Sequence, residues 1–294
     1  MTETRSAALL CRFRPIVDIL THHAHVLRER LRPPWVQRFL VAAAAVLFAG
    51  GALASWFSLD LRFGDLNAVP LAAVALIGVP STLALNSLET WLSARALGRR
   101  FSWPSAFVIT VYATAANMLP LPGGAMVRVA ALRAAGAGWR SGGAVNLAIA
   151  LVWLGAAFAV AWVLLADAQS NLAGGFAVAG IAGLVLGLGW LRSLSGGWSI
   201  GTRVLAVKLS GIAVTLARIW LMLASLGVVA SLAQVSVFAV AGVLGSTVSI
   251  VPAGLGVREA LSAGLAPAVA LAPATAFLAA ALNRLVGTAV LAVV

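Results

Sequence analysis

The sequence predicts an all-α, polytopic membrane protein. Of its 294 residues, 62% are hydrophobic and only 10% are charged, which is more apolar surface than a water-soluble domain can bury. Apolar runs long enough to cross a bilayer recur along most of the chain. These runs are continuous, whereas the strands of a membrane β-barrel alternate between apolar and polar residues over short segments. Composition and run length therefore indicate membrane-spanning helices.

The net charge of +12 is distributed as in a membrane protein rather than a nucleic-acid-binding protein. Arginines concentrate in the N-terminal residues and in a few short connections, as the positive-inside rule describes. We therefore expect a cytoplasmic N-terminus and no nucleic-acid partner. Cys11 is the only cysteine, so an intrachain disulfide is excluded.

Residues 1–38 form a basic segment, with Pro33-Pro34 near its end. The membrane domain, residues 39–294, follows it. Within it, apolar residues recur at roughly helical spacing: Ile16, Ile19, Leu20, Leu27 and Leu31. This spacing is typical of an amphipathic helix that lies on the cytoplasmic leaflet with its arginines facing anionic lipid. A partly disordered tail is the alternative, and the sequence favours neither.

Two spanning helices are predicted next, at residues 39–59 and 69–91, and Pro80 is expected to kink the second. Asp60 and Asp65 lie in the connection between them. Arginines follow the second helix: Arg95, Arg99 and Arg100. By loop charge, the first connection is external and the second is cytoplasmic.

Residues 103–119 are apolar and long enough to cross the membrane, but a simple crossing would place Arg128, Arg133 and Arg140 outside. A cluster of helix-breaking residues follows: Pro120, Pro122, Gly123 and Gly124. We therefore predict that the chain enters from the cytoplasm, breaks here and returns as a second half-helix. Such re-entrant backbone is tolerated only where protein or water covers it.

Four further spans are predicted, at residues 143–166, 172–191, 209–229 and 273–294. Cationic residues mark a cytoplasmic connection before the third of these: Arg192, Arg203 and Lys208. A second broken hairpin is expected within residues 235–265. The layout is thus six spans and two re-entrant hairpins that enter from opposite faces. A span, a hairpin and a span repeat with inverted topology, which is a common transporter architecture.

The two hairpins share a short motif. Residues 122–130 read PGGAMVRVA and residues 252–260 read PAGLGVREA, so Pro, Gly, Val, Arg and Ala recur at the same offsets. Proline stops the incoming helix and glycine permits the reversal. The outgoing helix then begins with unpaired N–H groups and a partial positive charge, which favour an anion. Arg128 and Arg258 follow within about one turn, and a guanidinium can bind two phosphate oxygens.

These considerations define a candidate binding site for an anionic head group. Its expected members are Asn117, Gly123, Gly124, Arg128, Gly254, Gly256, Arg258, Glu259 and Arg284. Asn117 precedes the first break and is expected to cap it. Arg284 either pairs with Glu259 or shares the head-group site. The structural alternative is that each motif arginine only pairs with Glu89 or Glu259. Glu89 and Arg218 are expected as counter-charges at matching places in the two repeats.

The residues for several kinds of catalysis are missing from the sequence. The histidines are His22, His23 and His25, all before the first span, so an intramembrane Ser–His pair and an HExxH motif are excluded. The eight acidic residues are scattered, which disfavours a metal-dependent phosphotransferase. There is no Walker motif. We expect no enzyme activity, no metal and no cofactor.

Two stretches resemble a known family. Residues 117–124 (NMLPLPGG) followed by Arg128, and residues 251–259 (VPAGLGVRE), are similar to the two signatures of the flippase-like transmembrane region of lysylphosphatidylglycerol synthases, and Asn283-Arg284 matches a recurrent arginine of its last span. The commoner first signature has Gly-Glu where Ala125-Met126 stand here, so no carboxylate role is expected there. The resemblance covers roughly residue 39 to the C-terminus.

The resemblance implies a bacterial inner-membrane protein that moves or binds an anionic phospholipid or polyprenyl-linked lipid, without the aminoacyl-transferase domain of the full-length synthases. The leading hypothesis is a lipid flippase or lipid-binding transporter. One alternative is an accessory module that presents lipid to a separate transferase partner, and another is a subunit of a membrane enzyme. The sequence specifies neither the lipid nor the oligomeric state.

Overall fold

The computed structural model describes residues 34–117, 123–166, 172–247 and 254–293. All regular secondary structure in these ranges is helical, and the fold class is confirmed. The helices are α2 (Pro34–Ser58), α3 (Ala68–Ala73), α4 (Val79–Ala96), α5 (Trp103–Ala116), α6 (Gly123–Ala134), α7 (Trp139–Leu165), α8 (Leu172–Ser195), α9 (Trp198–Ser225), α10 (Leu232–Thr247), α11 (Val257–Leu265) and α12 (Pro273–Leu291). The expected N-terminal amphipathic helix lies outside the described residues.

Six helical segments among the described residues are long and apolar enough to cross a membrane. They are Val41–Ser58, Ala68–Ala96, Trp139–Leu165, Leu172–Ser195, Trp198–Ser225 and Pro273–Leu291. Each corresponds to one of the predicted spans. Length and composition therefore predicted these helices correctly, and the protein is a multi-pass membrane protein.

The second span is interrupted by a wide turn. Five residues, Val74–Gly78, adopt a π-helical turn between α3 and α4, and Pro80 follows within the first turn of α4. Proline lacks the N–H that a regular helix needs, so the hydrogen bonds of the preceding turn are rearranged. A kink was predicted at Pro80, and the structure shows an irregular turn directly before the proline.

The helix that carries Lys208 corrects one prediction. α9 begins at Trp198 rather than at residue 209, so Lys208 lies inside a spanning helix and not in a cytoplasmic connection. Its side chain is buried and bonds the carboxylate of Glu89 on α4. A lysine is tolerated at such a position because the carboxylate of Glu89 and the aromatic ring of Trp153 on α7 take the place of its hydration shell.

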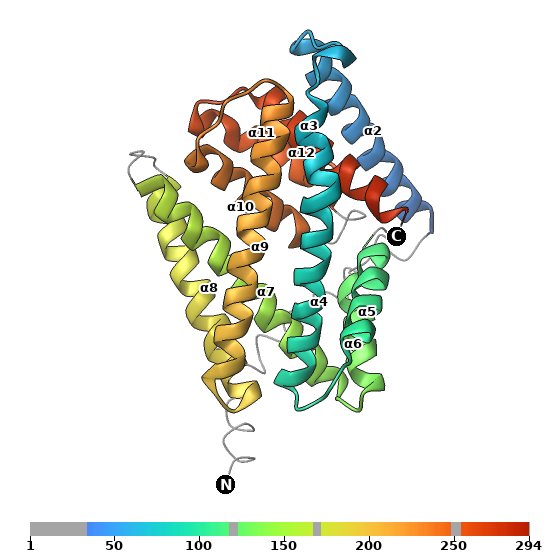
Figure 1. The fold of residues 1–294 in the computed structure, drawn as a ribbon, viewed down its shortest axis with the longest axis vertical. Helices are drawn as coiled ribbons and strands as arrows, with labels where there is room; N and C mark the ends of the chain where they lie inside the picture. The colour runs from blue at the N-terminus through green and yellow to red at the C-terminus, as the bar shows by residue number, and fades with distance from the viewer. Residues whose placement is uncertain (1–33, 118–122, 167–171, 248–253, 294) are drawn as a thin grey trace.

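Two pairs of shorter helices complete the bundle. α5 packs against α6, and α10 packs against α11. Figure 1 shows α5 and α6 in the lower half of the molecule, and α10 and α11 in the upper half. The connections inside both pairs, with Pro120, Pro122 and Pro252 of the predicted breaks, lie outside the described residues.

The two halves of the chain share an order of packing. α4 contacts α5, α5 contacts α6 and α6 contacts α7, and the series α9, α10, α11 and α12 does the same. The two remaining spans each cover the last helix of one series, because α8 packs on α7 and α2 packs on α12. α4 and α9 meet between the halves.

Glycines bring α7 and α8 into close contact. A Cβ atom added at Gly183 of α8 would lie 2.7 Å from the Cα atom of Gly155 on α7. An added Cβ atom at Gly180 or Gly187 of α8 would likewise lie 2.7 Å from the backbone nitrogen of Ala159 or Val152 on α7. Small residues at this spacing let two membrane helices approach until their backbones touch.

Gly183→Ala is therefore expected to destabilise the protein by about 1–3 kcal/mol, because the new methyl group meets backbone that cannot move aside. The midpoint of thermal unfolding in mild detergent measures the effect. Gly189→Ala on the same helix is the control, since no atom lies within 4 Å of its added Cβ. That variant should be neutral or slightly stabilised, as alanine favours helices. Equal effects would contradict the described packing.

Candidate functional site

Both hairpins close through glycines that touch a carbonyl at the end of the preceding helix. Gly123 at the start of α6 lies against the carbonyl of Ala116, and Gly254 ahead of α11 lies against the carbonyl of Gly245. A side chain at either position would collide with backbone. The repeated glycines therefore have a packing role in both hairpins.

The N-terminus of α6 is capped by its own chain. The side-chain oxygen of Asn117 accepts a hydrogen bond from the backbone N–H of Gly124 at 3.0 Å. This satisfies one of the N–H groups that a helix start leaves unpaired. The predicted capping role of Asn117 is confirmed, and it makes this helix start less available to an external anion.

Arg128 pairs with a buried carboxylate, which is the structural alternative stated for it above. Its Nη1 atom donates to Oε1 of Glu89 at 2.9 Å, while Nζ of Lys208 donates to Oε2. Lys208 also lies 5.0 Å from the ring centre of Trp153 on α7. We call Glu89, Arg128 and Lys208 the lower cluster. It joins α4, α6 and α9 through one carboxylate shared by two cations.

The second hairpin carries a different arrangement. Nε of Arg284 on α12 donates to Oε1 of Glu259 at 2.7 Å, and its Nη2 donates to the carbonyl oxygen of Gly254 at 2.9 Å. Glu259 is completely buried. Arg284 thus fastens the start of α11 to the last span, and the expected Glu259–Arg284 pair is present.

Arg258, next to Glu259 on α11, lacks such a partner. Its Nε atom is buried and, like Nε of Arg128, has no hydrogen-bond partner in the part of the chain that the structure describes, but unlike Arg128 it forms no ion pair there. The guanidinium interacts electrostatically with Glu259 and is repelled by Arg284 and Arg218. The backbone at Gly256, the residue before α11, is left-handed at φ 79° and provides no side-chain cap. The start of α11 therefore presents an uncapped helix end beside a guanidinium.

Arg218 of α9 completes this region. Its Nε donates to Oδ1 of Asn283 and its Nη1 donates to Oγ1 of Thr82, both at 3.0 Å. Glycines make room for it, because a Cβ at Gly78 or Gly287 would contact its side chain. Of the two expected counter-charges, Glu89 does pair with cations, whereas Arg218 is held by neutral groups among the described residues. We call Arg218, Arg258, Glu259 and Arg284 the upper cluster.

The interior charges do not balance. Among the described residues, cations outnumber carboxylates in both clusters. The lower cluster holds two cations and one carboxylate, and the upper cluster holds three cations and one carboxylate. Uncompensated charge is costly inside a membrane domain. The larger positive excess surrounds Arg258.

The structure distributes the predicted site residues between the two hairpins. Asn117, Gly123, Gly124 and Arg128 belong to the first, Gly254, Gly256, Arg258 and Glu259 belong to the second, and Arg284 lies on α12, the last span. Sequence reasoning missed the roles of Lys208, Trp153, Thr82 and Gly245. For Lys208 a signal existed, since it is the only lysine in the chain and an apolar stretch follows it directly.

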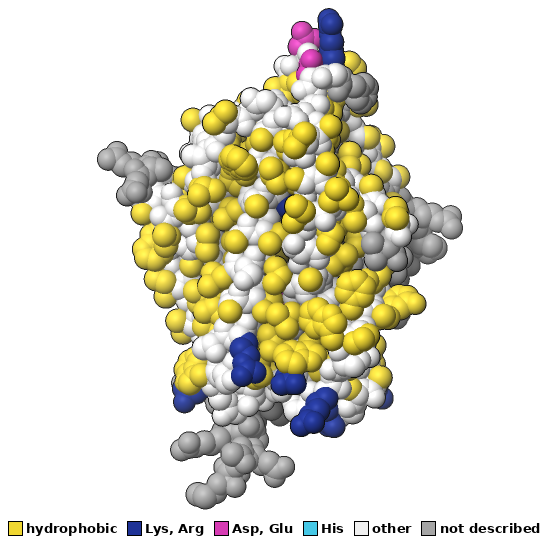
Figure 2. Space-filling model, in the orientation of Figure 1, with side chains coloured by type: hydrophobic (Ala, Val, Ile, Leu, Met, Phe, Trp, Pro, Cys, Tyr) yellow, Lys and Arg dark blue, Asp and Glu magenta, His cyan; other side chains and the backbone are white. Residues whose placement is uncertain are grey.

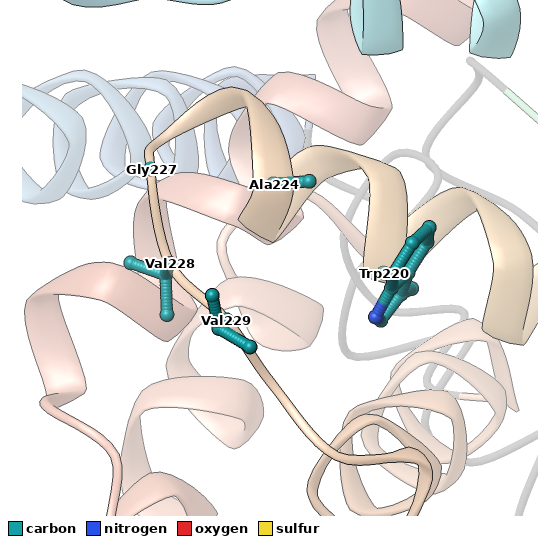
Figure 3. A pocket seen from close by; sticks show the side chains of 5 residues that line it. All are labelled: Trp220, Ala224, Gly227, Val228 and Val229. Carbon is teal, nitrogen blue, oxygen red and sulfur yellow. The ribbon is translucent and has the colours of Figure 1, made fainter.

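A shallow pocket of about 230 Å³ lies at the end of α9. Figure 3 shows its lining: Trp220, Ala224, Gly227, Val228 and Val229. The indole N–H of Trp220 already donates to the carbonyl of Ala230 at 3.2 Å, and none of the lining side chains is charged. The pocket suits apolar contacts and has no group that would recognise an anion.

The described residues contain no group of three or more His, Cys, Asp and Glu side chains placed to hold a metal ion. In comparisons with known proteins, no family model, no curated protein and no solved structure matches this chain. Membership of the lysylphosphatidylglycerol synthase family therefore stays a prediction. The two charged clusters are the features of this structure that bear on function.

Proposed function

We propose that this protein is a lipid transporter of the flippase type, and that it binds the negatively charged head group of a phospholipid or polyprenyl-linked lipid at the upper cluster. The proposal depends on one observation. Among the described residues, Arg258 forms no ion pair, and its buried Nε atom has no hydrogen-bond partner. The lipid is moved or held, and no bond in it is changed.

An anion at the upper cluster would correct the two deficits found there. It would accept hydrogen bonds from Arg258 and from the uncapped start of α11, and it would offset the excess of positive charge. A phosphate fits because a guanidinium binds two of its oxygens side by side. A lipid phosphate is favoured over a free one because the cluster lies among membrane-spanning helices, where acyl chains can stay in the bilayer.

Arg258 is a better binding residue than Arg128 in this structure. Nε of Arg128 is buried and unpartnered among the described residues, like that of Arg258, but Arg128 already donates to Glu89 through Nη1, and Asn117 already caps the start of α6. At the second hairpin Glu259 is engaged by Arg284, Arg258 forms no ion pair among the described residues, and Gly256, the residue before α11, has no side chain with which to cap it. We therefore assign head-group binding to Arg258 and a mainly structural role to the first motif. This revises the equal roles predicted for the two arginines.

The proposal includes a membrane orientation. In Figure 2 most of the visible Lys and Arg side chains gather at the lower end, whereas the Asp and Glu side chains lie at the upper end, where a Lys or Arg side chain accompanies them. By the positive-inside rule the lower end faces the cytoplasm of, we propose, a bacterial inner membrane. The α5–α6 and α10–α11 pairs are then re-entrant hairpins from opposite faces. Movement of one half against the other would expose the head-group site to each leaflet in turn.

Arg258→Gln tests this function in proteoliposomes that carry a fluorescently labelled phosphatidylglycerol. The wild-type protein should accelerate exchange of the label between leaflets, measured by chemical quenching of the outer leaflet. The variant should be slower by about tenfold or more, because a charge-assisted hydrogen bond to a buried ion contributes about 1.5–3 kcal/mol. Arg258→Lys keeps the positive charge but lacks the paired N–H donors of a guanidinium. Its exchange rate should lie between those of the wild type and Arg258→Gln.

Arg203→Gln is the matched control, because Arg203 is exposed on α9 and lies outside both clusters. It should exchange lipid at the wild-type rate, and all variants should share the wild-type unfolding midpoint. Normal exchange by a folded Arg258→Gln protein would contradict the proposal. Retention of labelled phosphatidylglycerol by the wild type without any exchange would instead assign the accessory role, in which lipid is presented to a separate transferase.

A further inference from the structure

Three arginines at the basic end of the molecule are stacked on tryptophan rings. Arg95 lies 3.8 Å from the ring centre of Trp91, Arg192 lies 4.7 Å from that of Trp198, and Arg133 lies 5.1 Å from that of Trp139. One pair lies in the last turns of α4, and the other two join the ends of α6 and α8 to the starts of the helices that follow. The same structural element therefore occurs at three separate places.

The three guanidiniums are exposed and have free donors. All three arginines are exposed, and within the described ranges none of them forms an ion pair. An aromatic face attracts a guanidinium without using its N–H groups, which lie in the plane of the cation. Stacking thus holds each cation in place while its fork stays available to an acceptor.

The neighbouring surface is that of a membrane interface. Trp139 and Trp198 are each 50% exposed, and Trp103 at the start of α5 is 47% exposed. Tryptophan rings favour the depth at which lipid head groups meet acyl chains. Figure 2 shows hydrophobic side chains directly above the Lys and Arg side chains of this end. A phosphate acceptor at this height is a lipid head group.

Among the described residues, the exposed charges of this end are all positive. Further exposed arginines accompany the stacked ones: Arg99, Arg100, Arg140 and Arg203. The described carboxylates lie elsewhere, since Glu89 and Glu259 are buried and Asp60 and Asp65 follow α2 at the opposite end. An anionic leaflet attracts each such cation, and the attraction decays within about one Debye length.

We infer that the arginine–tryptophan pairs Trp91/Arg95, Arg133/Trp139 and Arg192/Trp198 are binding sites for the phosphates of anionic phospholipids in the leaflet at the basic end. The ring of each pair lies at the head-group depth and orients the guanidinium, and the guanidinium fork binds the phosphate. These interfacial sites are separate from the upper cluster, and the inference does not depend on the proposed transport.

Lipid retention by the purified full-length protein tests the inference. The protein is extracted from bilayers with equal amounts of phosphatidylglycerol and phosphatidylcholine, and the retained lipids are quantified by mass spectrometry. The wild type should retain phosphatidylglycerol preferentially. The Arg95→Gln/Arg133→Gln/Arg192→Gln triple variant should lose that preference by more than about fivefold for each arginine replaced, because one cation near an anionic surface accounts for about fivefold and the hydrogen bonds of an oriented guanidinium to phosphate add to it.

A second triple variant separates stacking from charge. Arg100→Gln/Arg140→Gln/Arg203→Gln removes equal charge from the same end, from arginines for which the described residues show no tryptophan stacking. It should lose clearly less preference. Equal losses in the two triples would reduce the effect to net charge and overturn the inference, as would an unchanged preference in the first. The Arg→Lys triple at the stacked positions keeps the charge, and full preference there would also overturn it.

Two further measurements complete the test. Arg258→Gln removes only the lipid bound at the upper cluster, so the first triple variant should lower the preference for phosphatidylglycerol as much in the Arg258→Gln protein as in the wild type. Failure of the proposed transport site and failure of the interfacial sites then give different results. A single-stranded RNA oligonucleotide is added as a competitor, because phosphate is common to both ligands. If the RNA binds to the stacked arginines while lipid composition has no effect, the partner is a nucleic acid and the inference is wrong.

Discussion

Glu89→Gln is expected to destabilise the protein by about 3–5 kcal/mol, the usual result of removing one partner from a buried ion pair. Glu89 is 5% exposed and is bonded to both Arg128 and Lys208. Its neutralisation leaves two cations facing each other without a counter-charge, and Lys208 is itself only 8% exposed. α4, α6 and α9 meet at this carboxylate, so the contact between the two halves weakens.

A double-mutant cycle isolates the interaction. Lys208→Met should cost less than Glu89→Gln, since Glu89 keeps Arg128 as a partner. The Glu89→Gln/Lys208→Met protein should be more stable than Glu89→Gln alone, because the buried lysine is then no longer unpaired. Unfolding free energies in mild detergent measure all three variants. Asp60→Asn, at an exposed carboxylate, should change stability by less than about 0.5 kcal/mol. A Glu89→Gln protein as stable as this control would exclude the described cluster.

Gly254→Ala is expected to have a comparable effect, about 2–5 kcal/mol. Two causes add at this residue. Its φ is +64°, a left-handed conformation that alanine adopts only at a cost. An added Cβ would also collide with the carbonyl of Gly245, which belongs to the end of α10. Since Arg284 donates to the Gly254 carbonyl, the displacement would reach the upper cluster and slow lipid exchange as well.

Gly227→Ala separates the two causes. Gly227 follows α9 with φ +74°, and no atom lies within 4 Å of its added Cβ. This variant carries the conformational cost alone, about 1–2 kcal/mol. The difference between the two alanine variants, read from thermal unfolding midpoints, reports the contact between α10 and α11. No difference between them would indicate that the second hairpin is not closed as described.

The two clusters have consequences for how transport would occur. The lower cluster joins three helices of the two halves through two ion pairs, which suits a fixed contact. In the upper cluster Arg258 forms no ion pair among the described residues, which suits a site that must bind and release. The repeated motif is thus used in two different ways, one structural and one proposed for binding.

Several features could be predicted from local sequence because they depend on local physics. The six spans follow from the length of apolar runs, and the disturbance ahead of Pro80 follows from its missing N–H. The cap at Gly124 follows from an asparagine placed before a helix start. The start of α9 could not be predicted in this way, because a lysine normally ends an apolar run.

Partners of the buried charges depended on contacts far apart in the chain. Lys208 was expected in a cytoplasmic connection, yet it bonds Glu89, which is 119 residues away in sequence. A charged group buried among helices binds whichever opposite charge the packing brings within reach, and helix packing depends on all side chains at the contact. The glycines at residues 78 and 287 show this, since their role is to make room for Arg218.

The sequence alone determined the class of protein, its spans and the positions of its two repeated motifs, because transfer of apolar segments into lipid depends on each segment separately. Only the tertiary structure decided that Arg128 forms an ion pair with Glu89, whereas Arg258 forms none among the described residues. Two nearly identical motifs differ in this way because the charges that satisfy them come from other helices.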